Sequence, residues 1–228
     1  NEVGSDMENV AVIGAGFAGL VNALGHADLG DNVSYFDVCG VLDSSHNIQK
    51  KRLSLAASYA EAIHGAEFII IAGVPAKDML TVVESIADAL DHPLIIVNKS
   101  TVPVGTGDWV AEIIRNRRPD APEFAVVSCP EFLRKSNAAE DFMNPRRVIL
   151  GSVDHDTAVL VAEKFYPYFI PVTITDLDTA EMIKYAVNAF LATKVSFVNE
   201  ITNICKALGA DAEMVISSIG EISDYLLE

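Results

Sequence analysis

A glutamate follows directly on one of the apolar segments of the chain, where its carboxylate could act as a base. The stretch VVSCPEFLRKSN spans 126–137, and Glu131 comes immediately after Pro130. Proline has no N–H to donate to a sheet, so a strand over 124–128 must end before it. In open α/β sheets ligands bind beyond the carboxyl ends of the strands, which would place Glu131 beside a ligand. The alternative is a simple ion pair between Glu131 and Arg134.

A lysine and an asparagine stand four positions apart in an apolar helical stretch. Lys184 and Asn188 belong to TAEMIKYAVNAFLATKVSF, and their spacing puts them on one helix face, one turn apart. A cation and an amide that converge on one point can stabilise negative charge on an oxygen atom. Either residue alone is more often a solvated polar group on a helix surface.

The N-terminal segment VAVIGAGFAG contains a G-x-G-x-x-G pattern at Gly14, Gly16 and Gly19. The pattern follows an apolar strand and opens a helix. Gly14 would permit a tight turn, Gly16 the approach of a pyrophosphate, and Gly19 close packing of helix on strand. The helix N-terminus attracts phosphates, and Phe17 and Ala18 in its first turn complete this predicted cofactor-binding set.

An acidic residue ends the next predicted strand. Asp37 closes the run VSYFD, eighteen positions after Gly19. Its carboxylate would accept hydrogen bonds from the adenosine ribose hydroxyls. No Lys or Arg follows until Lys50, so a 2′-phosphate would meet only repulsion. The pattern predicts NAD rather than NADP as the cofactor; the alternative is a flavin or plain nucleotide fold.

Short β-branched runs alternate with helical stretches over most of the chain. The predicted strands are 10–14, 33–38, 68–72, 94–98, 124–128, 147–151 and 172–175, and the predicted helices are 17–30, 54–64, 76–91, 106–118 and 155–168. Continuous apolar runs are typical of strands buried on both faces, and strand–helix alternation is typical of right-handed βαβ units. This predicts an α/β fold with a doubly wound, Rossmann-like parallel sheet.

The C-terminal part has a different character. Residues 179–208 contain neither proline nor glycine, which predicts one long helix ended by Gly209. Asp211 could cap a further short helix that ends at about Ile219. We therefore divide the chain into an NAD-binding domain over 1–176 and a helical central region over 177–228. A helix as apolar as this one cannot bury all its faces by itself, so we expect a homodimer that forms through it.

The composition excludes several classes of protein. Of the 228 residues, 50% are hydrophobic and 21% are charged, which predicts a packed core. A net charge of −16 without a basic cluster argues against nucleic acid as a partner. Three distant cysteines without a C-x-x-C pair predict a reducing, cytoplasmic setting, and no apolar run is long enough for a membrane span. The five histidines show no ligand spacing, so no metal is predicted.

Three longer motifs occur in order with the glycine loop: VNKSTVPVGT at 97–106, SCPEFLRKSNAAEDFMNPRRVILG at 128–151, and the helix from 179 to 211. Together they resemble the UDP-glucose/GDP-mannose dehydrogenase family, and within it the members that oxidise UDP-glucose. The resemblance implies oxidation of the C6 alcohol of a nucleotide sugar to a carboxylate by two NAD, through a thioester on a cysteine. It also implies a product used in polysaccharide biosynthesis, and two Rossmann-like domains joined by a dimer-forming helix.

The resemblance also implies roles for individual residues. Glu131 matches the glutamate that acts with a water molecule as base in thioester hydrolysis. Thr101 matches the threonine that helps hold this water and faces the nicotinamide. Phe132–Leu133 match a segment that lies along the nucleotide sugar. Lys184 and Asn188 match the pair that binds the sugar C6 oxygen.

Several features depart from the family pattern. No stretch of this chain resembles the G-G-x-C-x-x-K-D segment that holds the catalytic cysteine, and the C-terminal nucleotide-sugar domain is expected to be absent. Cys129 and Cys205 are predicted to be structural thiols. The segment between Asp37 and Leu53 is shorter than in the family, and Lys135 replaces a glutamate.

Two other functions stay open. A β-hydroxyacid dehydrogenase of the 6-phosphogluconate type would also pair a Rossmann domain with a Lys-x-x-x-Asn helix, but the CPEFLR and KSTVPVGT stretches count against it. A non-catalytic, dimerising NAD-binding module would fit the missing cysteine and Lys135. Independently of these functions, Thr101 could be only a turn residue before Pro103.

Overall fold

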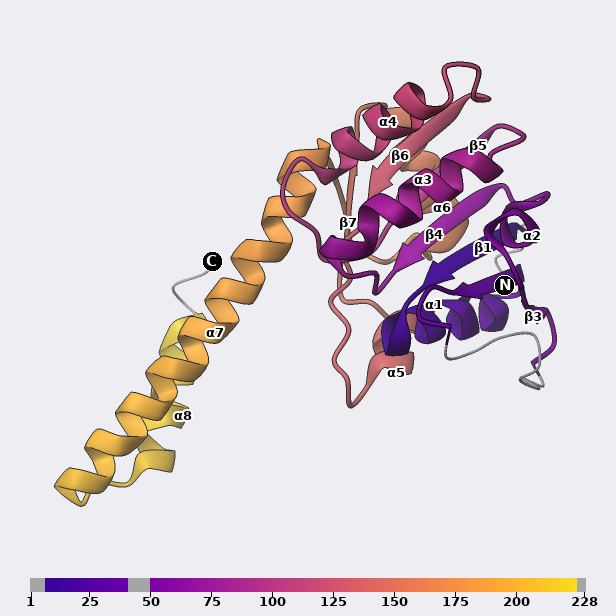
Figure 1. Cartoon of the computed structure of the whole chain (residues 1–228). Helices are drawn as coiled ribbons and strands as arrows, with labels where there is room; N and C mark the ends of the chain where they lie inside the picture. Colours follow the sequence, from indigo (N-terminus) through magenta and orange to yellow (C-terminus); the bar gives the residue numbers. More distant parts are fainter. Residues whose placement is uncertain (1–6, 41–49, 225–228) are drawn as a thin grey trace. The chain divides into compact units, whose positions relative to one another are not determined.

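The computed structural model describes residues 7–40 and 50–224 and divides into two compact units, Asn1–Lys184 and Tyr185–Glu228. The first unit contains one eight-stranded sheet with helices on both of its faces (Figure 1). The second unit contains the remainder of the long helix and the helix that follows it. The two units are described separately below.

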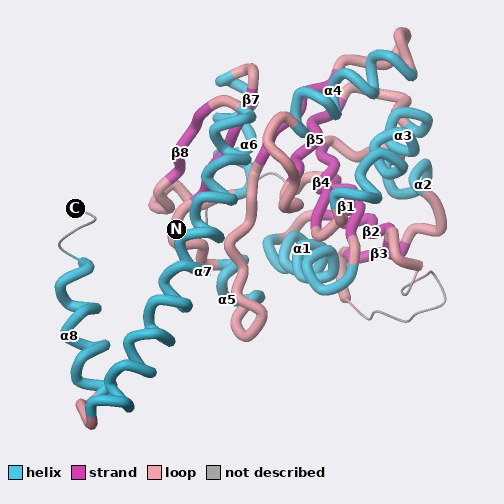
Figure 2. The backbone as a smooth tube through the Cα atoms, turned by 60° about the vertical axis from the view of Figure 1, so that its left-hand side comes forward, coloured by secondary structure: helices cyan, strands magenta, loops and turns pink. Residues whose placement is uncertain are grey.

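The sheet of the first unit has the strand order of a dinucleotide-binding fold. Its strands are β1 (Asn9–Gly14), β2 (Asn32–Asp37), β3 (Leu53–Leu55), β4 (Phe68–Ala72), β5 (Leu94–Asn98), β6 (Phe124–Ser128), β7 (Val148–Ser152) and β8 (Val172–Thr175). They lie in the order β3-β2-β1-β4-β5-β6-β7-β8, and Figure 2 shows the part from β3 to β5. The part from β3 to β6 is the 3-2-1-4-5-6 order, in which the direction of winding switches between β1 and β4. The predicted α/β, doubly wound fold is thus confirmed.

Two apolar layers hold the helices on the sheet. The helices of this unit are α1 (Gly16–Leu29), α2 (Tyr59–Ile63), η1 (Ala76–Asp78), α3 (Met79–Ala89), α4 (Thr106–Arg117), α5 (Ala138–Met143), α6 (His155–Phe165) and the start of α7 (Leu177–Leu208). Ile69 and Ile71 of β4 belong to the layer under α2, α3 and α4, whereas Phe68 and Ile70 belong to the layer under α1 and α6. This alternation is the period-two pattern of a strand buried on both faces.

One strand departs from the parallel sheet that the sequence predicts: β7 runs antiparallel to β6. The segment between these strands carries α5, which packs on α1: a Cβ added to Gly25 would lie 2.3 Å from the Phe142 ring. The chain therefore stays at the carboxyl end of β6 and enters β7 from that end. β8 then pairs parallel to β7 after the α6 crossover.

The predicted helix over 54–64 was wrong in its first half, which contains β3. The shorter helix α2 begins at Tyr59 because of reciprocal capping. The Ser58 hydroxyl accepts a hydrogen bond from Glu61 N at 3.1 Å, and the Glu61 carboxylate accepts one from Ala57 N at 2.7 Å. The S-x-x-E spacing is the sequence signal for such a helix start.

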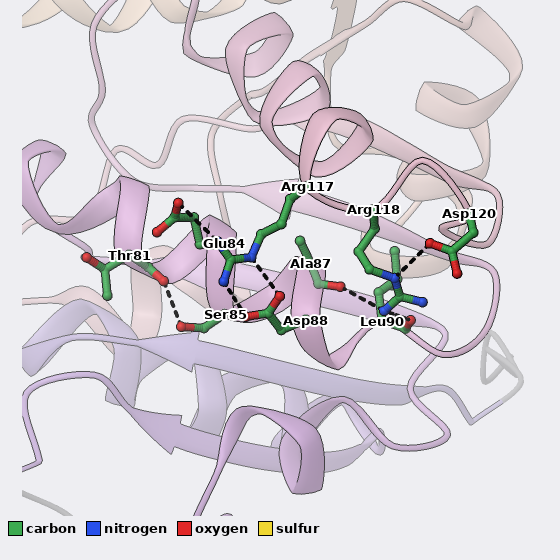
Figure 3. Close-up of polar contacts among 9 residues, drawn as sticks. All are labelled: Thr81, Glu84, Ser85, Ala87, Asp88, Leu90, Arg117, Arg118 and Asp120. Carbon is green, nitrogen blue, oxygen red and sulfur yellow. Dashed lines mark hydrogen bonds and ion pairs between the residues drawn. The ribbon is translucent and has the colours of Figure 1, made fainter.

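Two arginines at the end of α4 connect it to α3, the neighbouring helix on the same face (Figure 3). Arg117 binds Asp88 at 2.6 Å and Glu84 at 3.2 Å, two carboxylates one helical turn apart. Arg118 donates to the main-chain oxygens of Ala87 and Leu90, both at 3.3 Å, at the C-terminal end of α3. Because the Arg117 pairs are exposed, they fix orientation more than they stabilise.

The second unit begins within α7 and continues into α8 (Ala212–Asp224), which turns back from the end of α7 (Figures 1 and 2). The predicted end of the long helix is confirmed: Gly209 has a φ of +70°, and Ala210 N donates to Cys205 O at 2.9 Å. Asp211 accepts hydrogen bonds from Glu213 N and Met214 N, so the predicted cap of the next helix is also confirmed. α8 continues past 219, the end expected from the sequence.

A buried glutamate at the start of α7 attaches this helix to α4. Glu181 is 2% exposed and accepts hydrogen bonds from Gly105 N at 2.7 Å, Thr106 N at 3.1 Å and Gly107 N at 2.9 Å. These are N–H groups at the N-terminus of α4, where a negative charge is favourable. Glu181 therefore fixes the first turns of α7, including Lys184, relative to the sheet.

We expect Glu181→Ala to lower the free energy of unfolding by about 3 kcal/mol, because three N–H groups at the start of α4, two of them buried, lose a charged acceptor. Urea denaturation of the purified chain measures this loss. Glu181→Gln should lose less, since its amide keeps one acceptor oxygen. Glu163→Ala, on the exposed face of α6, is the matched control. Equal stability of the Glu181 and Glu163 alanine variants would contradict this role.

Candidate active site

The glycine loop lies at the carboxyl end of β1, beside the switch between β1 and β4. A Cβ on Gly14 would lie 2.6 Å from Gly19 Cα, so α1 approaches β1 as closely as only glycines allow. Gly16 has a φ of +57°, and an added Cβ there would meet no atom within 4 Å. The N-cap residue Ala15 offers no side-chain cap, and no acidic residue occupies the first turn of α1. This turn can therefore receive an anionic phosphate.

The remaining predicted cofactor residues lie around this loop. Asp37 is paired with Gly14 in the β1–β2 register, is buried, and accepts a hydrogen bond from Cys39 N at 3.0 Å. Phe17 is exposed and Ala18 partly exposed in the first turn of α1. The segment predicted to be shortened after Asp37 falls mainly in 41–49, outside the described residues.

Glu131 lies just beyond β6, where segments from opposite ends of the unit meet. Asn22 of α1 donates from Nδ2 to Glu131 Oε2 at 2.9 Å. Lys184 of α7 donates from Nζ to the main-chain oxygen of Glu131 at 2.7 Å. Arg134, the alternative partner of Glu131, instead binds Asp141 at 2.6 Å. The geometry thus brings the predicted base and the predicted cation together at the carboxyl edge of the sheet.

Burial changes the protonation of both groups. Burial raises the pKa of Glu131, and this rise is opposed by the Lys99 charge, the Asn22 hydrogen bond and the Lys184 charge. Burial lowers the pKa of Lys184, and the Glu131 charge opposes this change. A carboxylate with a raised pKa is a stronger base than an exposed one, which suits proton transfer near neutral pH.

Phe132 and Leu133 continue from Glu131 along the same edge. The Phe132 ring contacts two cations, with Lys184 Nζ at 4.8 Å and Arg147 Cζ at 5.4 Å from its centroid. Such cation–π contacts hold the ring in place and keep it beside Lys184. Leu133 packs against a small apolar cluster that joins α1 to α5.

Sequence reasoning missed a buried lysine and a buried asparagine. Lys99 is 7% exposed at the end of β5, with Nζ 4.7 Å from the Phe142 ring centroid, and its charge acts on Glu131. Its signal was present, because it ends a buried strand within the VNKSTVPVGT motif. Asn22 had a weaker signal, as a polar residue on the apolar side of α1.

Three predicted positions take less part in these contacts. Thr101 follows β5 and is exposed, as is Lys135 beyond Leu133. Asn188 is exposed in the second unit, one helical turn after Lys184 along α7. Their roles therefore stay predictions.

The cysteines agree with the structural roles predicted for them. Cys129 is buried with Sγ 3.3 Å from Tyr166 Oη, and burial raises the pKa of its thiol, which makes it a poor nucleophile. Cys205 is buried in the second unit.

Three further observations bear on other possible functions. Within residues 7–40 and 50–224, no three side chains of His, Cys, Asp or Glu converge as a metal site would require. Over the same residues, no helix combines the length and apolar character needed to cross a bilayer. A cavity of about 600 Å³ lies at the opposite, amino edge of the sheet, with Asn32, Arg52 and His64 in its lining.

Two models of one protein family match successive parts of the chain. Residues 42–170 match the NAD-binding domain of the UDP-glucose/GDP-mannose dehydrogenase family, and residues 178–225 match its central domain. The glycine loop precedes the first matched range but belongs to the same sheet. The family match confirms the predicted cofactor, NAD.

Individual proteins that are similar to this chain carry the names of the same family. UDP-glucose 6-dehydrogenase TuaD of Bacillus subtilis strain 168 is 39% identical over 245 residues, covering 94% of this chain and 52% of the relative. A UDP-glucose dehydrogenase structure from Pyrobaculum islandicum has a TM-score of 0.83 at 28% identity, covering 96% of this chain and 58% of that one. A GDP-mannose dehydrogenase structure from Pseudomonas aeruginosa has a TM-score of 0.81 at 28% identity, covering 92% and 56%. The chain spans about half the length of the curated relatives it matches, and it belongs to the UDP-glucose/GDP-mannose dehydrogenase family.

Proposed function

We propose that this chain forms the NAD-binding and central part of an enzyme that oxidises the C6 alcohol of a nucleotide sugar, with UDP-glucose as substrate and UDP-glucuronate as product. The observation that carries the proposal is the contact of Lys184 Nζ with the main chain of Glu131, beside the helix that follows the glycine loop. This contact supports the proposal, because it joins the proposed base to a cation at the edge where α/β sheets bind their ligands.

The residues present fit NAD. The uncapped first turn of α1 would hold the pyrophosphate, the open space at Gly16 admits it, and Asp37 would bind the adenosine ribose. Bound NAD supplies a hydride acceptor for the sugar C6 carbon.

The other residues act on the sugar and on water. Lys184 and Asn188 would hold the C6 oxygen and stabilise negative charge on it. Glu131 would take a proton from water during thioester hydrolysis, with Thr101 helping to hold that water. Phe132 and Leu133 would lie along the nucleotide sugar. The thioester needs a cysteine nucleophile, for which Cys129 is unsuited, so we propose that it comes from a part of the enzyme beyond this chain.

Titration calorimetry with NAD tests the cofactor site. We expect the chain to bind NAD in preference to NADP, and Asp37→Ala to weaken NAD binding by about tenfold or more, because two ribose hydroxyls lose their acceptor. Asp156→Ala, whose side chain is fully exposed on α6, is the matched control. Equal NAD affinity of the two variants would contradict the role of Asp37.

Adding nucleotide sugars separates the proposed enzyme from the alternatives. We expect UDP-glucose to change the affinity of the chain for NAD without sustained formation of NADH. Sustained NADH formation would contradict the proposal that the cysteine comes from outside this chain. An NAD affinity that neither UDP-glucose nor GDP-mannose changes would favour the non-catalytic module.

The free energy of unfolding should depend on pH because ionised Glu131 is unfavourable in the folded chain. Its pKa in the folded state lies above the ordinary value of 4.5. At a pH between the ordinary pKa and the higher pKa of the folded state, Glu131 is ionised in the unfolded chain but still protonated in the folded chain. The free energy of unfolding therefore falls as the pH rises through this range. We therefore expect Glu131→Gln to gain stability relative to the wild type as the pH rises above 4.5.

Urea denaturation between acidic and neutral pH measures this difference. Glu163→Gln, on an exposed position of α6, should show no such dependence on pH. If the stability difference between wild type and Glu131→Gln does not change with pH, the carboxyl group is not perturbed by burial.

We also propose that the protein is a cytoplasmic homodimer that forms through α7. The helix exposes Phe190, Leu191 and Val195, at 53%, 52% and 61%. Sedimentation analysis should find a dimer that Leu191→Glu dissociates and that Ser196→Glu, which adds the same charge at an exposed position on the opposite side of α7, leaves intact. A monomeric wild-type chain would contradict this proposal.

A further inference from the structure

Asn22 is a fully buried polar residue in the second turn of α1, with 0% of its surface exposed. Its neighbours Val21 and Ala23 are buried apolar residues. A buried amide is costly unless it forms hydrogen bonds, so its contacts show what it does.

Both contacts of the Asn22 amide are made by its nitrogen. Nδ2 donates to Ala18 O at 2.9 Å, one turn earlier in α1, and to Glu131 Oε2 at 2.9 Å. Oδ1 is buried and has no hydrogen-bond partner within the described part of the chain. The amide thus donates two hydrogen bonds, while its oxygen accepts none from the described residues.

The Ala18 contact fixes the orientation of the amide. A helix carbonyl can only accept hydrogen bonds, so the nitrogen has to face it. Rotating the amide by half a turn would place Oδ1 against two oxygen atoms. Asn22 can therefore act toward Glu131 only as a donor, and a donor favours the ionised carboxylate over the protonated acid.

We propose that Asn22 is a positioning residue that holds the carboxylate of Glu131 as an ionised, oriented acceptor and ties it to the first turn of the cofactor-binding helix. The assignment of Glu131 as the base rests on the proposed function. The contact itself, between residues 109 positions apart, does not.

The charged and titratable groups around Glu131 come from four other segments. Lys99 follows β5, Lys184 lies on α7, Cys129 directly follows β6, and Tyr166 follows α6. Lys99 and Lys184 favour the carboxylate by charge, whereas Cys129 and Tyr166 are buried groups with raised pKa values. Asn22 donates a hydrogen bond to the carboxylate oxygen, and this bond orients the Glu131 carboxylate as well as stabilising its ionised form.

Carbon-13 NMR of the chain labelled at the glutamate carboxyl carbons tests the proposal. Comparison with Glu131→Gln assigns the Glu131 signal, and its chemical shift is followed as a function of pH. In Asn22→Leu, which has a similar shape but no donor, we expect the titration midpoint of Glu131 to rise further. In Asn22→Asp, a second carboxyl faces Glu131, so we expect a larger rise with coupled titration of the pair.

Asn137→Leu is the matched control. Asn137 also donates from Nδ2 to a glutamate, Glu140 at 3.1 Å, but on the exposed surface. It should leave the Glu131 midpoint unchanged. Thermal unfolding verifies that each variant is folded; Asn22→Leu removes an unpartnered oxygen, and Asn22→Asp keeps the size of the native side chain.

An unchanged Glu131 midpoint in folded Asn22→Leu or Asn22→Asp would overturn the proposal. The titration of Glu131 needs neither NAD nor turnover. A raised Glu131 midpoint in the Asn22 variants, together with a wild-type chain that does not bind NAD, would support the role of Asn22 and contradict the proposed function. A wild-type chain that binds NAD, together with an unchanged midpoint in the variants, would support the proposed function and contradict the role of Asn22.

Discussion

The geometry of the candidate site depends on one buried carboxylate, that of Glu181. It binds three main-chain N–H groups at the start of α4 and so fixes the first turns of α7 against the sheet. Lys184 lies one turn later on the same helix, where its ammonium group reaches the main chain of Glu131. A single capping interaction thus determines whether a residue from the long helix can meet a residue from the end of β6.

The second constraint is the cost of burying Glu131. Burial alone would favour the protonated acid, which could not act as a base. Two lysines and one amide oppose this effect from three different elements, α7, the end of β5 and α1. The cations of Lys184 and Arg147 both contact the ring of Phe132, the residue that follows Glu131. The site therefore combines a carboxylate of raised pKa with fixed neighbours, an arrangement typical of general bases.

The sequence predicts those features that depend on local pattern. The G-x-G-x-x-G loop, Asp37 and the strands from β4 to β6 follow from spacing and apolar runs, and the structure has them at the expected positions. The reversal of β7 was not predictable in this way, because it depends on α5 packing against α1 through Phe142 and Gly25. The same holds for Asn22, whose partner is distant in sequence, and for Lys99, whose burial depends on tertiary packing.

In the proposed function, the carboxyl edge of the sheet forms one site for cofactor and chemistry. The most direct test is to titrate nitrogen-15-labelled chain with NAD and map the backbone amide shifts. We expect shift changes in 14–19, at Asp37, in 99–101 and around Glu131, all at the carboxyl ends of their strands. Changes confined to the cavity at the amino edge, around Asn32, Arg52 and His64, would contradict it.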